Sequence, residues 1–307
     1  MEVQTAATCA EPARLNADCR CVTLDRQRLA ADVTASSGEQ AFWGDYIAPR
    51  PHLFADSAVF VAGADLRAMQ HTVAAVEAAA ALPAYQDAAF ARAPQARTDF
   101  GPRGVLMGYD FHVGADGPQL IEVNTNAGGA FLNAALQGAH DPCCGDLATT
   151  GAFAARIVAM FQAEWAAQGR TAPLRRVAIV DDLPVQQYLF PEFLLAQRLL
   201  EAAGIDAVIA DAAELAAHDG ALWHAGKAID LVYNRLVDFA LAEPGHAALR
   251  QAYEHGDVVV TPNHAPRLTA VAVNERENLH LVVEGALHLL DRKSTRLNSS
   301  HVKRSRM

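Results

Sequence analysis

Cysteine and lysine are both scarce in this chain of 307 residues. Five cysteines are too few for a disulfide framework in a chain of this length, and none forms a Cys-x-x-Cys pair. His140 lies close to the adjacent Cys143 and Cys144, which permits a zinc site, but we favour ordinary thiols in a loop. Only three lysines occur, and two of them, Lys293 and Lys303, fall in the final fifteen residues.

Long apolar runs and basic stripes are also missing. No stretch approaches the roughly 20 apolar residues that a membrane-spanning helix needs, and the N-terminus has neither the basic nor the apolar region of a signal peptide. The formal net charge is −10, which argues against a nucleic-acid partner. We therefore expect a cytoplasmic protein that binds neither nucleic acid nor membrane.

The final segment differs in composition from the rest of the chain. Residues 291–307 hold six basic residues against one acidic residue, and a basic disordered tail is one interpretation. We favour another, because DRKSTRLNSSH (residues 291–301) is similar to the translation of a common short-read sequencing adapter. We therefore expect residues 291–307 to be non-native and the native sequence to be interrupted at about residue 290.

Apolar periodicity divides the remaining chain in two near residue 170. In the first part, helical spacing predicts a helix over 64–81 that ends at Pro83. In the second part, strands alternate with helices, which predicts a mostly parallel sheet with right-handed crossovers. We expect an α/β protein with an α+β first half and with domains at 1–170 and 171–290. The expected strands of the second part are 175–182, 205–211, 230–235 and 257–262, its helices are 186–203 and 245–254, and a hairpin turn falls at Ala225–Gly226.

Residues 109–124 alternate between polar and apolar side chains around the turn GADG. Centring the turn on Asp116 places Asp110 directly opposite Glu122, with Cβ atoms about 5 Å apart. The same register pairs Phe111 with Ile121. The side chains then form a polar face, Asp110, His112, Glu122 and Asn124, and a core face, Tyr109, Phe111, Val113, Ile121 and Val123.

The polar face has the composition of a site for a divalent cation. Two facing carboxylates repel each other, and a cation between them removes that cost. Mg²⁺ prefers oxygen ligands and often combines one or two carboxylates with water or phosphate oxygens. Asp110, Glu122 and the side-chain oxygen of Asn124 meet that demand, and the alternative is a solvated polar face. Gly128 and Gly129 follow, and they would let the backbone approach an anion at the start of the next helix.

The order Asp110, then Glu122-Val-Asn124, then a glycine pair resembles the metal-binding end of ATP-grasp ligases, such as glutathione synthetases and D-alanine–D-alanine ligases. The resemblance covers roughly residues 104–130. It implies that Asp110, Glu122 and Asn124 hold the Mg²⁺ ions that bridge the phosphates of ATP. It also implies that Asn126 binds substrate or phosphate at the catalytic centre.

Three further residues have two interpretations each. Arg103, just before the first strand of the hairpin, can meet a phosphate or a substrate carboxylate at the catalytic centre, or lie at the surface as many arginines do. Asn234 and Arg235 follow a strand of the second part, and they can line a ligand site at the strand ends or serve the fold alone.

The order of the parts is similar to that of circularly permuted ATP-grasp proteins, a group that includes glutathionylspermidine-synthase-like proteins. The metal motif comes first and the Rossmann-like half follows. In that arrangement the nucleotide lid and its lysines come last, after a helix that residues 274–283 resemble. Outside the tail the only lysine is Lys227, in the expected turn. We therefore expect an incomplete, circularly permuted ATP-grasp fold without its lid.

The resemblance implies an ATP- and Mg²⁺-dependent ligase that joins a carboxylate to an amine or a thiol through an acylphosphate. Its partners would be small-molecule or peptide carboxylates and amines. We expect little or no ligase activity from this chain, because the lid is missing. The alternative is a non-catalytic module that binds a metabolite or a peptide on a degenerate ATP-grasp scaffold.

Overall fold

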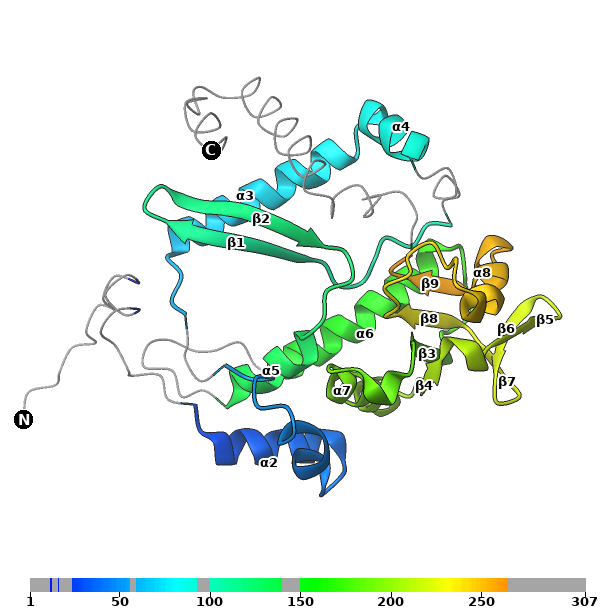
Figure 1. The fold of residues 1–307 in the computed structure, drawn as a ribbon, viewed down its shortest axis with the longest axis horizontal. Helices are drawn as coiled ribbons and strands as arrows, with labels where there is room; N and C mark the ends of the chain where they lie inside the picture. Colours follow the sequence, from blue (N-terminus) through cyan, green and yellow to red (C-terminus); the bar gives the residue numbers. More distant parts are fainter. Residues whose placement is uncertain are drawn as a thin grey trace, which may run out of the picture. The chain divides into compact units, whose positions relative to one another are not determined.

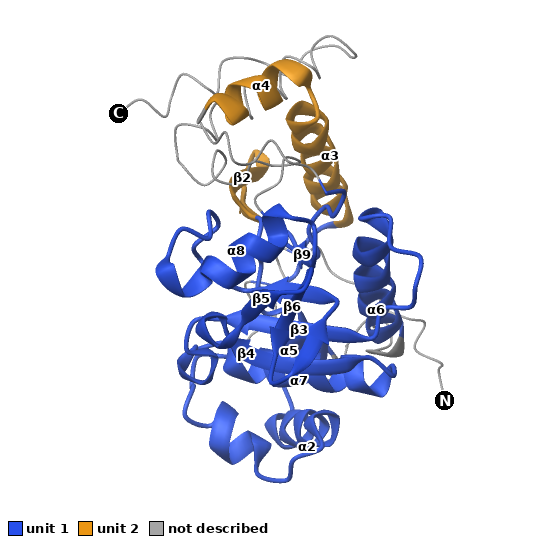
Figure 2. Ribbon diagram, turned by 90° about the vertical axis from the view of Figure 1, so that its right-hand side faces the viewer, with its two compact units in different colours: residues 1–62, 99–107, 125–263 blue, residues 63–98, 108–124, 264–307 orange. Residues whose placement is uncertain are grey.

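The computed structural model describes residues 24–55, 59–92, 100–139 and 150–263, together with Pro12 and Asn16. The chain forms two compact units (Figure 2). Unit 1 contains residues 1–62, 99–107 and 125–263, and unit 2 contains residues 63–98, 108–124 and 264–307.

Several sequence-based expectations fall outside the described residues. They concern Cys143 and Cys144, the expected helix over 274–283 and the tail at 291–307. The mixed α/β character of the protein is confirmed. The expected domain boundary near residue 170 falls inside unit 1, and the division into domains at that point stays a prediction.

Unit 2 is a β-hairpin packed against a long helix (Figure 1). The predicted helix over 64–81 is confirmed, and Pro83 begins the next helix because proline is tolerated in the first turn of a helix but not in its interior. The elements of the unit are α3 (Gly63–Ala80), α4 (Pro83–Arg92), β1 (Gly108–Gly114) and β2 (Gly117–Asn124).

Unit 1 is built on a four-stranded sheet in the order β4-β3-β8-β9, with every neighbouring pair parallel (Figure 1). The sheet is therefore parallel, as predicted. Its strands are β3 (Arg176–Asp181), β4 (Asp206–Asp211), β8 (Leu231–Asn234) and β9 (Val259–Thr261).

Other elements of unit 1 surround this sheet. A π-helical turn covers Trp43–Ile47, and a small antiparallel sheet has the order β5-β6-β7. The α-helices are α2 (Arg26–Ser37), α5 (Ala130–Gly138), α6 (Thr150–Ala167), α7 (Phe190–Ala202) and α8 (Ala247–Glu254). The small sheet consists of β5 (Ala216–His218), β6 (Ala221–His224) and β7 (Lys227–Ile229).

Alternate side chains of the parallel strands enter two separate cores. Val177 and Ile179 of β3 pack with residues of α2, α5, α6 and α7, whereas Ala178 and Val180 pack with residues of α8 and of the small sheet. Both faces are covered, so the strands are nearly continuous apolar runs. None of the helices in the described part of the chain is long and apolar enough to cross a membrane.

The hairpin of unit 2 keeps the predicted register at its open end but not near its turn. Asp110 lies opposite Glu122, as predicted, but Phe111 pairs with Leu120 rather than with Ile121, and His112 correspondingly pairs with Gln119. The turn has two residues instead of the symmetric three that we assumed. The register therefore shifts by one residue between Asp110 and Phe111, which forms a β-bulge.

This shift corrects the predicted core face of the hairpin. Ile121 and Val113 were expected in the core, but they are 52% and 46% exposed. Ile121 is the extra residue of the bulge and so leaves the core face, whereas Val113 stays on the face of Tyr109 and Phe111 but lies at the end of β1, next to the turn. Leu120 is partly buried instead, and Val123, beyond the bulge, is fully buried as predicted.

Candidate functional site

The three predicted metal ligands lie together on β1 and β2. The amide nitrogen Nδ2 of Asn124 lies 3.0 Å from Glu122 Oε1 and 3.4 Å from Asp110 Oδ2. Asp110 and Glu122 are exposed register partners on the two strands. The amide therefore bridges two carboxylates that would otherwise only repel each other.

This donor set fits a hard divalent cation. Partial desolvation, followed by the charge of Glu122, raises the pKa of Asp110, and a cation between the two carboxylates would relieve that repulsion. Turning the Asn124 amide over presents its oxygen in place of its nitrogen. In the described ranges, no group of three or more His, Cys, Asp or Glu side chains could hold a metal. A cation here would need the Asn124 oxygen and water or phosphate oxygens to complete its shell.

The other face of the hairpin fixes these ligands in place. The hydroxyl of Tyr109 donates a hydrogen bond to the Glu77 carboxylate of α3. Burial, followed by this hydrogen bond, raises the pKa of Tyr109. Together with the buried Val123, this contact holds the strand backbone from which Asp110 and Asn124 project.

Asn126 belongs to unit 1, and both ends of its amide already have protein partners. Its Oδ1 accepts a hydrogen bond from Nη1 of Arg235, and its Nδ2 donates to the Leu236 carbonyl at 3.3 Å. The same Arg235 nitrogen donates to the Ala127 carbonyl at 3.0 Å. These bonds tie the segment after β2 to the segment after β8.

A carboxylate of the protein lies at the helix start where we predicted an anion. The N–H groups of Gly129 and Ala130, at the start of α5, donate to Glu192 Oε1 at 2.8 and 3.1 Å. Glu192 lies on α7 and is buried, and burial raises its pKa although these bonds and Arg235 oppose the shift. A Cβ atom at Gly128 would lie 2.5 Å from Leu189 Cδ1 and 3.1 Å from Arg235 Nη2, so a larger residue here would have to displace these two side chains.

Arg103 also belongs to unit 1, and its side chain is exposed. The backbone N–H groups of Arg103 and Gly104 donate to the buried carboxylate of Glu164 on α6, at distances of 2.9 to 3.1 Å. Thr261 Oγ1 donates to the same carboxylate at 2.6 Å. The backbone at Arg103 is therefore anchored, while its guanidinium reaches solvent.

The predicted site residues thus form groups within each unit. Unit 2 brings Asp110, Glu122 and Asn124 into mutual contact distance. Unit 1 holds Asn126, Gly128 and Gly129 within one short segment, and it also holds Arg103.

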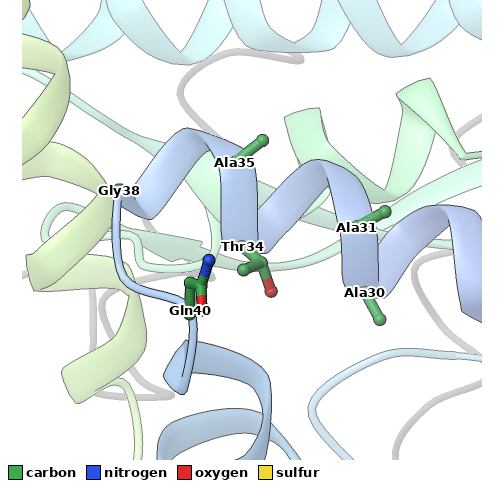
Figure 3. Close-up of a pocket in the computed structure, with 6 residues that line it drawn as sticks. All are labelled: Ala30, Ala31, Thr34, Ala35, Gly38 and Gln40. Carbon is green, nitrogen blue, oxygen red and sulfur yellow. The ribbon is translucent and has the colours of Figure 1, made fainter.

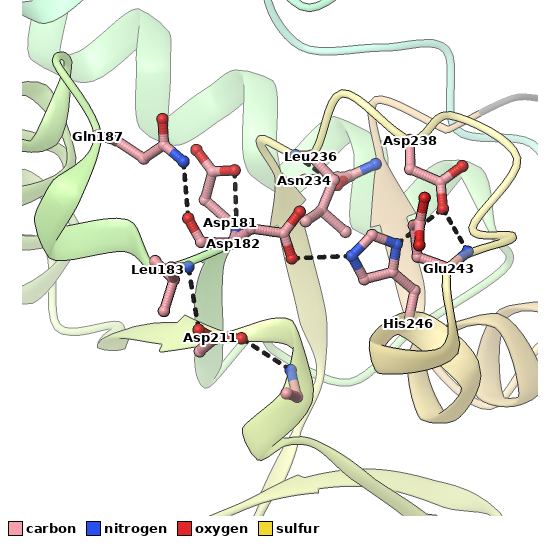
Figure 4. A network of polar contacts seen from close by, with 11 residues as sticks. Asp181, Asp182, Leu183, Gln187, Asp211, Asn234, Leu236, Asp238, Glu243 and His246 are labelled. Carbon is pink, nitrogen blue, oxygen red and sulfur yellow. Dashed lines mark hydrogen bonds and ion pairs between the residues drawn. The ribbon is translucent and has the colours of Figure 1, made fainter.

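A second polar cluster lies at the carboxyl ends of β3, β4 and β8, where the sequence pointed only to Asn234 and Arg235 as residues that can line a ligand site (Figure 4). His246 is buried between two carboxylates, with Nε2 2.9 Å from Asp182 Oδ1 and Nδ1 2.8 Å from Asp238 Oδ2. Burial alone would lower the pKa of His246, but its bonds to these two carboxylates raise it. The pKa of Asp238 is lowered, because backbone N–H donation and His246 outweigh the effect of burial.

Asp181, the last residue of β3, is buried in the same cluster, with 8% of its surface exposed. Burial raises its pKa to about 6, against the opposing effects of the Asp182 N–H group and Arg235. The sequence signal for this cluster is the pair Asp181-Asp182 directly after an apolar strand. We missed it because an aspartate pair alone does not show whether either side chain is buried.

Hollows in the surface of unit 1 lie away from these residues. One of about 580 Å³ follows the exposed side of α2 and is lined by Ala30, Ala31, Thr34, Ala35, Gly38 and Gln40 (Figure 3). A larger one of about 740 Å³ lies among α5, α6 and α7 and is mostly apolar. Neither is lined by a predicted site residue, and most of the residues that line them are apolar.

The chain matches no protein-family model and no curated protein. The likeness to ATP-grasp ligases therefore depends on the residues quoted above.

Proposed function

We propose that the protein belongs to an ATP- and Mg²⁺-dependent ligase of the circularly permuted ATP-grasp type, which joins a carboxylate to an amine or a thiol. The observation that supports this most is the pairing of Asp110 with Glu122 beside Asn124 on one exposed face. Two carboxylates and a carboxamide in contact distance are a suitable ligand set for Mg²⁺.

In this proposal, Asp110, Glu122 and Asn124 hold Mg²⁺, and the cation neutralises and aligns the phosphates of ATP when bound. The protein's own part is positional, since Tyr109 and Val123 fix the strands that carry the ligands. Arg103 contributes an exposed guanidinium for a phosphate or a substrate carboxylate. Asn126 is proposed to contact substrate after exchanging one of its present partners.

Metal binding tests the proposal most directly. Titrating the protein with Mn²⁺, followed by electron paramagnetic resonance, should show one site that Glu122→Gln weakens by at least about tenfold. Asp116→Asn is the matched control, because it removes an exposed carboxylate at the turn of the same hairpin. Equal Mn²⁺ binding by the wild type and Glu122→Gln would exclude the proposed ligand set.

One observation favours the alternative of a non-catalytic binding module. The N–H groups of Gly129 and Ala130 already bind the Glu192 carboxylate, so a phosphate at this helix start would have to displace it. The two functions differ in their response to Mg–ATP. The ligase proposal requires Mg–ATP to raise the melting temperature of the full-length protein with its lid, in a manner that Glu122→Gln abolishes, and the binding-module function requires no response from either protein.

A further inference from the structure

His246 connects two segments that leave the carboxyl edge of the parallel sheet (Figure 4). Asp182 directly follows β3, and Asp238 lies in the connection between β8 and α8. The Nε2 atom of His246 lies 2.9 Å from Asp182 Oδ1, and its Nδ1 atom lies 2.8 Å from Asp238 Oδ2. Because β3 and β8 are neighbours in the sheet, the two contacts tie the ends of adjacent strands together. We refer to these three side chains as the histidine bridge.

The histidine bridge needs a proton on each ring nitrogen of His246. An ionised carboxylate only accepts hydrogen bonds, so each of the two contacts requires an N–H group on the imidazole. The protonated ring has two such groups, whereas the neutral ring has one N–H group and one lone pair. When His246 loses its proton, one of the two contacts therefore sets a lone pair against a carboxylate oxygen and breaks.

The exposure of the two carboxylates decides which contact breaks. The Asp238 side chain is 18% exposed, and its Oδ2 atom also accepts a hydrogen bond from the N–H of Glu243 at 2.8 Å. The Asp182 side chain is 51% exposed, and among the described residues its carboxylate has no partner besides His246. Asp182 can therefore exchange His246 for water at little cost, which Asp238 cannot. Neutral His246 should keep its proton on Nδ1, toward Asp238.

In the described part of the chain, the ring of His246 bonds to these two carboxylates alone. Arg250, in the first turn of α8, donates instead to the Leu241 carbonyl at 2.8 Å. The elements around His246 are the ends of β3 and β4, the turn Ala212–Glu214, the connection after β8 and the first turn of α8. Besides the two bridge carboxylates, their charged groups are Asp181, Asp211, Glu214, Arg235, Glu243 and Arg250.

We propose that the histidine bridge is a pH-dependent switch at the carboxyl edge between β3 and β8: protonated His246 holds both carboxylates, and neutral His246 keeps Asp238 and releases Asp182. Release leaves the segment between β3 and α7 with fewer ties to the rest of unit 1. The switch is independent of the proposed function, because none of its three side chains is a predicted site residue.

The direction of the switch follows from the surroundings of His246. Its two carboxylate partners raise the pKa of His246 above the usual value of about 6.5. The bridge is therefore complete at mildly acidic pH, and Asp182 is released as the pH rises through the folded value.

NMR of the imidazole nitrogens in the full chain, labelled with ¹⁵N-histidine, tests the switch between about pH 5 and about pH 9. We expect both ring nitrogens of His246 to be protonated at the acidic end, and Nε2 alone to lose its proton as the pH rises. The signals of His246 are those that Asp182→Asn shifts and Asp219→Asn does not. Asp219→Asn is the matched control, because Asp219 forms an exposed pair with His218 at 3.0 Å elsewhere in unit 1.

Backbone hydrogen exchange measures the release itself. The N–H groups of Leu183, Gln186 and Gln187 are hydrogen-bonded in the segment between β3 and α7. After correction for the intrinsic effect of pH, we expect them to exchange about three- to tenfold faster at pH 9 than at pH 6. Asp182→Asn should remove this difference, because a carboxamide can accept from the protonated ring or donate to the neutral one. Asp182→Ala should exchange fast at both pH values.

Any of four results would overturn the proposal. They are loss of the proton from Nδ1 instead of Nε2, retention of both protons up to about pH 9, equal corrected exchange at the two pH values, and a pH difference in exchange that Asp182→Asn retains. A difference that Asp219→Asn removes would likewise assign the response to another histidine. If Asp182→Ala does not fold, the wild type and Asp182→Asn decide by themselves.

Discussion

Single residues in this protein owe their properties to partners that are distant in sequence. Asp181 and Asp182 are adjacent, yet Asp181 is buried and accepts a backbone hydrogen bond, whereas Asp182 is exposed and paired with His246. The difference arises because alternate side chains at a strand end point in different directions. Each aspartate therefore makes a different contribution to stability.

Replacing Asp181 with asparagine should stabilise the protein at neutral and alkaline pH. Its folded pKa of about 6 lies above the roughly 3.9 of an unfolded aspartate, so ionisation opposes folding as the pH rises through 6. We expect Asp181→Asn to raise the free energy of unfolding at pH 8 by on the order of 1–3 kcal/mol. The gain should disappear toward about pH 4 in urea denaturation series.

Asp211→Asn is the control for this prediction. It should give no gain at pH 8, because both oxygens of Asp211 already accept backbone hydrogen bonds. A gain in both variants would indicate relief of general acidic repulsion instead of the burial of Asp181.

His246 should stabilise the protein most at mildly acidic pH. Its folded pKa is raised by Asp182 and Asp238, so its contribution is complete below about pH 6.5 and is lost as the pH rises through the folded value. The lowered pKa of Asp238 acts oppositely, and its contribution is lost only under more acidic conditions.

We therefore expect His246→Gln to reduce the free energy of unfolding by about 1–3 kcal/mol at pH 6, and by less at pH 9. Urea denaturation of both proteins at several pH values measures this difference. A loss of the same size at every pH would show that His246 stabilises by packing alone.

At the scale of elements, the β-bulge decides which hairpin side chains are buried. The regular register would put both Ile121 and Val123 in the core, but the bulge buries only Val123 and leaves Ile121 exposed. The predicted metal ligands keep their predicted register, because Asp110, Glu122 and Asn124 lie between the bulge and the open end of the hairpin.

Two alanine substitutions distinguish these registers. Val123→Ala should cost about 1–3 kcal/mol, because it leaves a cavity at a fully buried position. Ile121→Ala should change the stability by no more than about 0.5 kcal/mol. Thermal and urea unfolding of both variants measure the difference, and equal losses would support the regular register.

The helices and strands of unit 1 follow their sequence signals more closely. The strand predicted at 175–182 is β3, and the hairpin turn predicted at Ala225–Gly226 joins β6 to β7 with both residues at positive φ. The segment at 57–63 illustrates the opposite case. Its apolar composition is typical of a strand or a buried segment, but Val59 is 80% exposed and the described part of the segment up to Ala62 forms neither helix nor strand.

At the scale of the whole molecule, unit 1 depends on apolar cores on both faces of its sheet. Leu200 of α7 lies in one core and Leu249 of α8 in the other, and both are fully buried. Each Leu→Ala substitution should cost about 2–5 kcal/mol. Because the sheet separates the two sites, the double variant should lose the sum of the two costs to within about 0.5 kcal/mol.

Urea denaturation of the two single variants and the double variant measures this additivity. A much smaller cost for either single variant would show that its core is not closed in solution. A sum that greatly exceeds the double-variant loss would show that the two faces unfold as coupled parts.

The sequence by itself determined the mixed α/β character, the parallel sheet and the facing of Asp110 and Glu122. These features depend on local periodicity and on turn residues, which neighbouring residues encode. Only the tertiary structure decided that Ile121 lies outside the core, that Glu192 lies at the start of α5, and that Asp181 is buried. Each of these depends on a contact between segments distant in the sequence, or on a register shift of a single residue, and neither leaves a periodic signal in the chain.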